Sequence, residues 1–369
     1  MGFTEVKVEN KFFVDAVSPE KRGTCVKVSD MYGLKACHTV IGDAKIHDMN
    51  FGFLSTELAK LHTKLYEPKW YVTWQEDVPF DNGGGLVDYV EWYSVNYAGI
   101  LNNNRNLVSN NANYIPRVNA AMTQNLAKVF TYQVAYDLRF VELEKMKKEK
   151  LQKSIQDIYN DAILAGWNLF VQDIAYVGDA AGVTGLFNDA KVMVNTVTNT
   201  GTTGHGFEGL ADDVVVAAIN GIFATYLKES NLNVTILPDR ILVPMFVMND
   251  LVSRFSALYS NSLYDFVIDH NLAKAQAKGK NFSLEIVGRD ALDTMGTGGH
   301  GRMVAYKKDK DFVRIDIPYQ MQHYITLPNI ERMAYTSAFL GQVSQIQLPY
   351  NQDANEFGIV SYWDFTTEA

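Results

Sequence analysis

The stretch Trp70-Tyr-Val-Thr-Trp74, the turn Asp81-Asn-Gly-Gly-Gly85 and the stretch Tyr89-Val-Glu-Trp-Tyr93 follow one another along the chain. Apolar and polar residues alternate in both outer stretches, which is typical of β-strands, and a glycine-rich turn between two such stretches favours a hairpin. We therefore predict an aromatic β-hairpin, with one strand from Trp70 to Trp74 and a return strand from Leu86 to about Tyr97.

Large aromatic side chains dominate this predicted hairpin, at Trp70, Trp74, Trp92 and Tyr93. On a projecting ribbon they would expose apolar area of the kind that usually marks a protein contact. An isolated two-stranded ribbon is also only marginally stable in water. These four residues are therefore candidate subunit-interface residues. The alternative interpretation is that the hairpin packs on its own domain.

A strand over Val129–Tyr136 and a long helix come next in the sequence. Apolar residues recur at intervals of three and four, which predicts a helix from Asp137 or Glu142 to about Tyr176. Such a helix of about 30 residues would be roughly 45 Å long. Glycines end it, and the segment Ala181-Gly-Val-Thr-Gly-Leu-Phe-Asn188 follows.

The rest of the chain divides by its residue patterns. Residues 3–47 alternate in short runs and predict a strand-rich arm, and a short helix is expected at 53–61. The asparagine-rich residues 101–114 predict a loop. Strand and helix patterns alternate from 210 to 290, with strands expected at Val234–Pro238 and Asp265–Ile268, which favours an α/β lobe. Further strands are expected between Arg302 and Asp364.

Composition excludes several classes of protein. The 369 residues are 47% hydrophobic and 20% charged, as in globular proteins, and carry a net charge of -9. A protein that grips nucleic acid through its phosphates needs a basic surface instead. The two cysteines, Cys25 and Cys37, do not form a disulfide framework. No signal peptide or membrane-spanning segment is predicted.

The motifs that could carry chemistry do not have the surroundings that chemistry needs. Gly296-Thr-Gly-Gly-His-Gly301 has the spacing of a dinucleotide site, but the residues that follow it predict a strand instead of a helix. His205 lies near Glu208 in a glycine-rich loop without further ligands. The basic run Lys145–Lys153 is interpreted as the solvated side of a helix, or as a face toward DNA or a scaffold. We predict no catalytic, cofactor or metal site.

Taken in order, the helix before Pro68, the hairpin, the strand, the long helix and the turn at 181–188 resemble the encapsulin-like major capsid family of tailed phages. The similarity is clearest from about residue 50 to residue 190. Asp316-Ile-Pro318 and Leu348-Pro-Tyr350 are compatible with it.

The resemblance implies an α+β fold of the Hong Kong 97 type. Residues 1–66 would form the N-terminal arm, 67–118 the extended β-hairpin loop, and 119–190 the peripheral domain with its spine helix. The axial α/β domain would span 191–300, and 301–369 would supply return strands of the peripheral domain and a C-terminal strand.

The resemblance also implies a major capsid protein that self-assembles into hexamers and pentamers of an icosahedral shell around double-stranded phage DNA. The expected partners are other copies of the chain, a portal, a separate scaffold protein, and packaged DNA contacted non-specifically on the inner face. The expected location is the virion, after assembly in the host cytoplasm, with no membrane partner.

Two alternatives stay open at this point. The first is a shell protein of the same fold that encloses cargo in a bacterial nanocompartment. The second is an enzyme that uses the lobe at 191–300, with His205 or His300 in its site.

Overall fold

The computed structural model describes residues 25–28, 36–39, 71–98, 119–146, 154–179, 182–197, 206–255, 261–277, 282–325, 328–351 and 357–366. The chain divides into two compact units, Met1–Glu67 with Lys150–Gln152, and Pro68–Glu149 with Lys153–Ala369. In the first unit, strands β1 (Cys25–Val28) and β2 (Ala36–Thr39) form an antiparallel pair within the region predicted to be strand-rich. The predicted helix at 53–61 and the loop at 101–114 lie outside the described residues.

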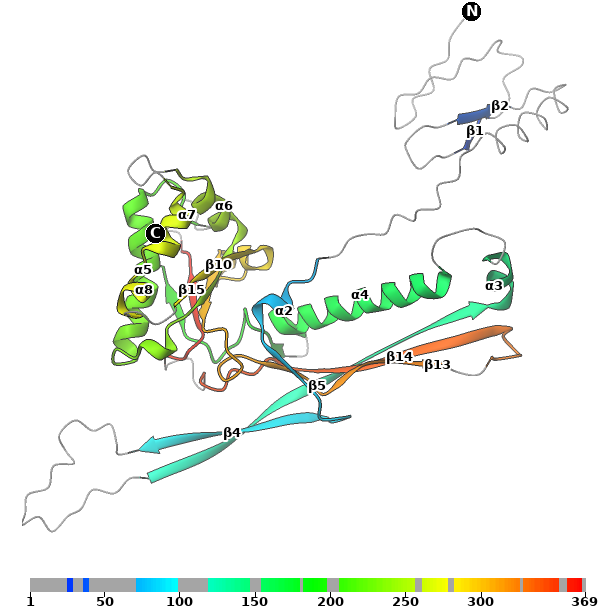
Figure 1. Cartoon of the computed structure of the whole chain (residues 1–369), viewed down its shortest axis with the longest axis horizontal. Helices are drawn as coiled ribbons and strands as arrows, with labels where there is room; N and C mark the ends of the chain where they lie inside the picture. Colours follow the sequence, from blue (N-terminus) through cyan, green and yellow to red (C-terminus); the bar gives the residue numbers. More distant parts are fainter. Residues whose placement is uncertain are drawn as a thin grey trace, which may run out of the picture. The chain divides into compact units, whose positions relative to one another are not determined.

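The second unit contains a four-stranded antiparallel sheet with the strand order β13-β14-β5-β4 (Figure 1). Its strands are β4 (Tyr89–Ala98), β5 (Asn119–Arg139), β13 (Tyr319–Ile325) and β14 (Ala334–Ser344). The predicted strand at 129–136 is confirmed and is part of β5, whose 21 residues span about 70 Å.

Strand β5 changes its partner halfway along its length. Its first half, Asn119–Lys128, pairs with β4, and its second half, Val129–Arg139, pairs with β14 on the other edge. Strand β4 and the first half of β5 therefore form a two-stranded ribbon that continues beyond the end of β14 (Figure 1). We call these residues, 89–98 and 119–128, the ribbon.

The predicted hairpin is wrong in its first strand. Helix α2 (Trp74–Asp77) starts where the strand was expected to end, and β4 pairs with β5 instead. The segment lies against the long helix α4 (Ile155–Tyr176) instead. The Thr73 amide donates a hydrogen bond to Oε1 of Gln172 in that helix, at 2.9 Å. A short strand β3 (Phe80–Asn82) then pairs in parallel with β12 (Ile315–Ile317). The second strand of the hairpin consequently lies beyond residue 118, the predicted end of the extended loop.

The predicted long helix is also two helices, α3 (Phe140–Met146) and α4 (Ile155–Tyr176). Strand β5 continues to Arg139, so the helical pattern does not begin at Asp137. Helix α4 begins with a capping box, in which the Ser154 hydroxyl accepts from the Asp157 amide and the Asp157 carboxylate accepts from the Ser154 amide. The spine is therefore 22 residues long, about 33 Å, instead of the expected 45 Å.

Helix α4 packs on the sheet through aromatic rings. The ring of Tyr132 meets that of Trp167 at 5.5 Å, and Tyr136 stacks on Tyr159 at 5.0 Å. At Gly166 a side-chain carbon would come within 2.9 Å of the Tyr132 hydroxyl. Glycine at this position of the helix thus permits the close approach of Tyr132.

The Gly-Leu-Phe-Asn turn after α4 satisfies the helix's last carbonyl groups. The amides of Leu186 and Phe187 donate to the carbonyls of Ala175 and Tyr176, at 2.8 and 2.9 Å. A side-chain carbon at Gly185 would lie 2.4 Å from the Tyr176 carbonyl carbon. Only glycine therefore fits at position 185 of this turn.

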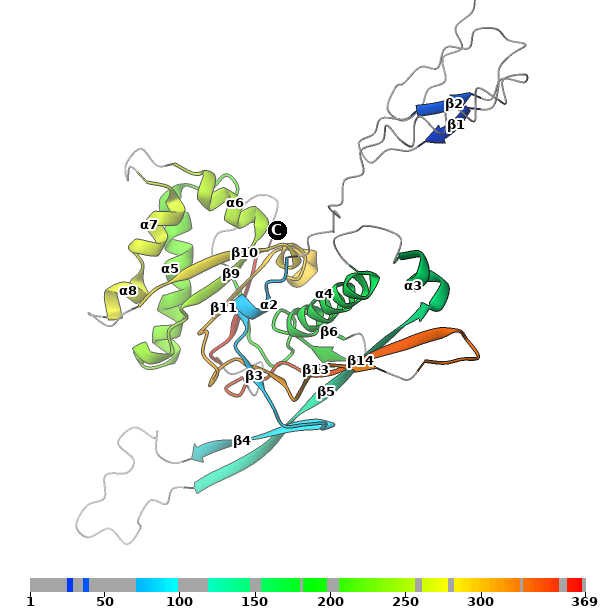
Figure 2. The ribbon, with the colours of Figure 1, turned by 45° about the vertical axis from the view of Figure 1, so that its right-hand side comes forward.

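The α/β lobe contains a five-stranded sheet with the order β10-β9-β11-β15-β8, in which β9 and β10 are parallel (Figure 2). Alternate residues of its strands point to opposite faces of the sheet. In β9, Ile241 and Val243 pack in one apolar cluster with the helices of the lobe, whereas Leu242 packs in a second cluster with residues of α4. The strands are β8 (Val194–Thr196), β9 (Arg240–Pro244), β10 (Glu285–Arg289), β11 (Arg302–Tyr306) and β15 (Ser361–Asp364). The helices are α5 (Asp212–Glu229), α6 (Met245–Ser253), α7 (Leu263–Asp269) and α8 (Leu272–Ala277).

Two strands predicted in the lobe are helical instead. Residues Val234–Ile236 form the 3-10 helix η2, which Asn233 caps by accepting from the Thr235 amide. The run Asp265–Ile268 lies in α7, which begins where the Ser262 hydroxyl accepts from the Asp265 amide. A serine cap three residues before an acidic residue outweighed the strand preference of the short apolar run.

The domain boundary predicted at residue 300 does not separate the five-stranded sheet of the lobe from the four-stranded sheet. Strand β11 lies between β9 and β15 in the lobe's sheet, although its residues were expected among the peripheral return strands. Arg302 at its start pairs with Asp364 of β15 at 2.6 Å, and both side chains are buried. The return strands of the four-stranded sheet are β13 and β14.

A buried carboxylate connects α2 with α4 and with the lobe. Asp77 is fully buried and accepts from Nε of Arg240 at 3.1 Å and from Nε of Arg289 at 2.6 Å. The Tyr176 hydroxyl of α4 donates to the same carboxylate, and the Tyr306 hydroxyl of β11 donates to the Asp77 carbonyl. Burial, followed by the charge of Asp77, raises the pKa of Tyr176, so this phenol stays protonated. We call these five residues the Asp77 cluster.

Replacing Asp77 with alanine should lower the free energy of unfolding by about 3–5 kcal/mol, because two buried guanidinium groups lose their shared counter-charge. Denaturant unfolding of the unassembled chain measures this change. Asp81→Ala is the matched control, since Asp81 pairs with Lys310 at 3.4 Å in an exposed position. Equal effects of the two substitutions would contradict a special role for the buried cluster.

Candidate subunit-contact surface

The ribbon has two faces because side chains alternate along each strand. Opposite residues share a face, so Tyr89, Glu91, Tyr93 and Val95 lie with Lys128, Leu126, Gln124 and Met122. The large apolar members of this face are exposed to solvent: Tyr89, Tyr93, Val95, Met122 and Leu126. We call these five side chains the ribbon face.

The other side of the ribbon is less accessible. Val90, Trp92 and Ser94 are half-buried there, and Ala127 is buried. The ribbon therefore presents its exposed large apolar side chains on one side. Because large exposed apolar patches usually mark contacts with other proteins, the ribbon face is a candidate contact surface.

The base of the ribbon is fixed by hydrogen bonds to the strands below it. The amides of Gly83 and Gly85 donate to the carbonyls of Ile317 and Pro318, both at 3.1 Å. The Val87 amide donates to Oε1 of Gln342, also at 3.1 Å. Gly83, Gly84 and Gly85 all have positive φ, between 77° and 125°, which side chains disfavour. The three glycines thus make the turn into β4 possible.

The structure separates the four candidate interface residues that the sequence suggests. Tyr93 is 59% exposed and belongs to the ribbon face. Trp92 is half-buried on the other side of the ribbon. Trp74 is only 1% exposed and packs edge-on against Phe80 at 5.3 Å, so it is a core residue. Trp70 lies outside the described residues.

Sequence reasoning missed Met122 and Leu126, which lie opposite Val95 and Glu91. The run 119–128 contains little strand-forming pattern apart from these two residues, separated by four positions. Met122 and Leu126 lie on the ribbon face only because their strand pairs with β4. They could have been predicted there only if residues 119–128 had been recognised as the partner strand of β4.

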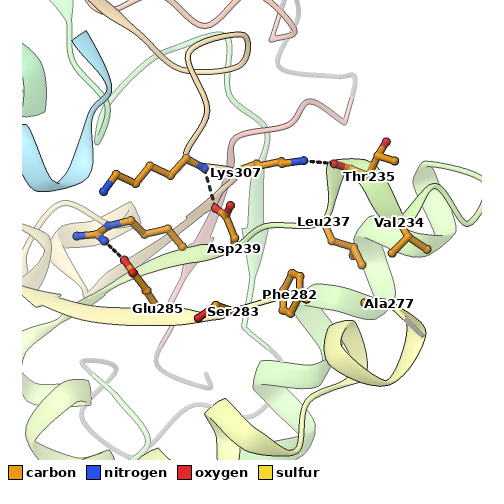
Figure 3. A pocket seen from close by; sticks show the side chains of 11 residues that line it. Val234, Thr235, Leu237, Asp239, Ala277, Phe282, Ser283, Glu285 and Lys307 are labelled. Carbon is orange, nitrogen blue, oxygen red and sulfur yellow. Dashed lines mark hydrogen bonds and ion pairs between the residues drawn. The ribbon is translucent and has the colours of Figure 1, made fainter. Parts of the chain in front are cut away.

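The lobe also contains a pocket of about 440 Å³ at the start of β9 and β10 (Figure 3). Three of its charged groups bond to the protein itself: Asp239 accepts from the Lys308 amide at 2.7 Å, Lys307 donates to the Thr235 carbonyl, and Arg240 pairs with Glu285. Burial raises the pKa of Asp239. No histidine or cysteine lies among the lining residues.

The glycine motif at 296–301 is followed by a strand, as the sequence predicts. It contains the 3-10 turn Thr297–Gly299 and leads directly into β11, without the helix that a pyrophosphate site requires. His300 does not line the pocket in the lobe, and His205 lies outside the described residues.

In the described part of the chain, no group of three His, Cys, Asp or Glu side chains is placed to hold a metal ion. No described helix has both the length and the apolar character needed to cross a membrane.

A family model for the major capsid protein matches residues 104–354, which is more than half of the chain. No curated protein matches the sequence. Among solved structures, a chain from the capsid of Myoviridae phage XM1 is similar with a TM-score of 0.63 and 15% identity, covering 85% of this chain and 98% of that chain.

A chain from Microbacterium phage Oxtober96 is similar with a TM-score of 0.52 and 12% identity, covering 88% of this chain and 99% of that chain. A chain from the capsid of the native GTA particle is similar with a TM-score of 0.53 and 9% identity, covering 84% of this chain and 96% of that chain. At these identities the likeness shows a shared fold.

The geometry predicts opposite outcomes for two aromatic residues. Tyr93→Ala removes an exposed ring, so the free energy of unfolding should change by no more than about 0.5 kcal/mol while self-association weakens. Trp74→Ala removes a core ring and should cost about 3–5 kcal/mol of folding stability. Denaturant unfolding and size-exclusion chromatography measure the two properties. A destabilised Tyr93→Ala chain beside an unaffected Trp74→Ala chain would refute these assignments.

Proposed function

The chain belongs to the major capsid protein family and forms the shell of a phage capsid, and from that premise we propose how its parts build the shell. Its fold is of the Hong Kong 97 type, as the sequence predicted. The observation that carries the proposal is the exposed apolar ribbon face on a chain of this family.

In the proposed assembly, copies of the chain form hexamers and pentamers, which together close an icosahedral shell around double-stranded DNA. Each copy lays its ribbon on a neighbouring copy, so that the ribbon face becomes buried. One such contact is weak, but each copy takes part in several at once. Many weak contacts then give a stable shell through multivalency.

The proposed division of the chain follows the sheets. Residues 1–66 would be the N-terminal arm, and the extended loop would run from 67 through the ribbon to about 128. The remainder of β5 with α4, β13 and β14 would be the peripheral domain. The lobe, including β11 and β15, would be the axial domain. Its two-sided core supports this grouping, because β9 and β11 contribute to the same apolar cluster.

The proposed partners besides other copies are a portal, a separate scaffold protein and the packaged DNA. The net charge of -9 supports a non-specific and weak contact with DNA on the inner face, since tight binding would need a basic surface. The capsid belongs to the virion. Assembly in the host cytoplasm is part of the proposal.

The role is proposed to be structural and not enzymatic. In the pocket of the lobe, Arg240 pairs with Glu285 and Asp239 accepts from the Lys308 amide, and the glycine motif leads into a strand. Nothing in the comparisons supports a nanocompartment shell or an enzyme that uses the lobe.

Electron microscopy of the purified chain tests the proposed assembly. We expect closed icosahedral particles, because each copy carries a ribbon face that can be buried on a neighbouring copy. Particles purified from producing cells should protect double-stranded DNA from nuclease. A chain that stays monomeric under all assembly conditions would contradict the proposal, and particles filled with a co-purifying protein instead of DNA would favour the nanocompartment.

A further inference from the structure

The turn that leads into the ribbon begins with an Asn-Gly pair, Asn82-Gly83. An asparagine reacts with its own backbone most readily in this dipeptide, because glycine leaves the next amide nitrogen unshielded. The nitrogen of Gly83 attacks the side-chain carbonyl carbon of Asn82, ammonia leaves, and a five-membered succinimide ring forms. Water then opens the ring at either carbonyl, which gives aspartate or isoaspartate. This deamidation consumes only water.

The surroundings of Asn82 leave room for deamidation. Asn82 is exposed, and its carboxamide makes no hydrogen bond to another described residue. A side-chain carbon at Gly83 would meet no atom of the described residues within 4 Å, so the attacking nitrogen is not crowded. Two more glycines follow Gly83, and glycine adopts more backbone conformations than any other residue.

The pairing of β3 with β12 opposes deamidation in the folded chain. The Gly83 amide donates to the Ile317 carbonyl at 3.1 Å, and Asn82 lies opposite Ile317 in the parallel pair. Ring closure requires this hydrogen bond to break and Asn82 to leave its extended conformation, which holds the nitrogen away from the side-chain carbon. Because Asn82 is the last residue of a three-residue strand, only the end of β3 has to open.

A second Asn-Gly pair in the same chain provides an internal comparison. Asn220-Gly221 lies in the middle of α5, whose amides are bonded within the helix. The Asn220 side-chain oxygen also accepts from the Leu272 amide of α8 at 2.9 Å. Seven residues of α5 are buried in the core of the lobe, so exposing this pair requires that core to open. The end of a short strand opens at a lower free-energy cost than a packed helix.

We propose that Asn82 is a site of spontaneous deamidation, and that opening of the end of β3 sets its rate. Isoaspartate lengthens the main chain by one methylene group, just before the glycines that lead into β4. Aspartate places a second negative charge beside Asp81. Either product changes the base of the ribbon, and the change is irreversible because ammonia is lost. The reaction belongs to the single chain and does not require shell assembly.

Mass spectrometry of peptides from the full, folded chain tests the proposal after incubation at mildly alkaline pH, where loss of the amide proton favours the attack. Asn82 should convert at least about tenfold faster than Asn220, because the end of β3 opens more often than α5. In denaturant the two rates should become similar, since no structure then restrains either pair. Equally slow conversion of Asn82 and Asn220 in the folded chain would overturn the proposal.

Asn82→Gln assigns the mass change to this residue. Glutamine keeps the carboxamide, but its attack requires a six-membered ring, which forms much more slowly. The mass change of the peptide should therefore disappear in this variant. A mass change that persists in Asn82→Gln would place the reaction at another asparagine and refute the site.

Phe80→Ala tests the control by β3. The Phe80 ring packs edge-on against Trp74 at 5.3 Å, so its loss should loosen β3. Conversion of Asn82 should become severalfold faster, while conversion of Asn220 in the same sample stays unchanged. An unchanged Asn82 rate, or an equal rise at Asn220, would contradict local control by this strand.

Discussion

The buried carboxylate of Asp77 is the interaction on which the placement of the ribbon depends. An isolated carboxylate in the interior would be strongly unfavourable, and the two guanidinium groups of Arg240 and Arg289 compensate for its burial. These groups come from β9 and the end of β10, while Tyr176 comes from α4. Helix α2 is therefore held between the spine helix and the lobe, and the chain leaves it through β3 toward the ribbon in one direction.

Strand β5 extends this constraint to the ribbon face, because its first half carries Met122 and Leu126. In the second half of the strand, Tyr132 and Tyr136 pack against α4. A two-stranded ribbon alone would be marginal. Here it is the continuation of a sheet that a helix covers, and it needs a partner only for its exposed face.

Much of this architecture was predictable, and the errors have physical causes. The period of three and four in α4 and the short apolar runs of β9 and β11 are patterns that are local in the sequence, and the capsid fold was implied by the resemblance to a known family. The pairing of β4 was not local: its partner begins 21 residues after its end, at Asn119. Trp74 was expected on a surface because aromatic residues serve both cores and contacts, and composition does not distinguish the two. The helix caps Ser154 and Ser262 are visible in the sequence. They would have given the correct start of α4 and would have predicted that Asp265–Ile268 is helical.

A cryo-electron microscopy structure of the assembled shell would show what the ribbon contacts. We expect Tyr89, Tyr93, Met122 and Leu126 to be buried against a neighbouring copy, while Asp77 keeps both arginine partners. A shell in which the ribbon face stays exposed to solvent on every copy, with the contacts made elsewhere, would contradict the proposed role of the ribbon.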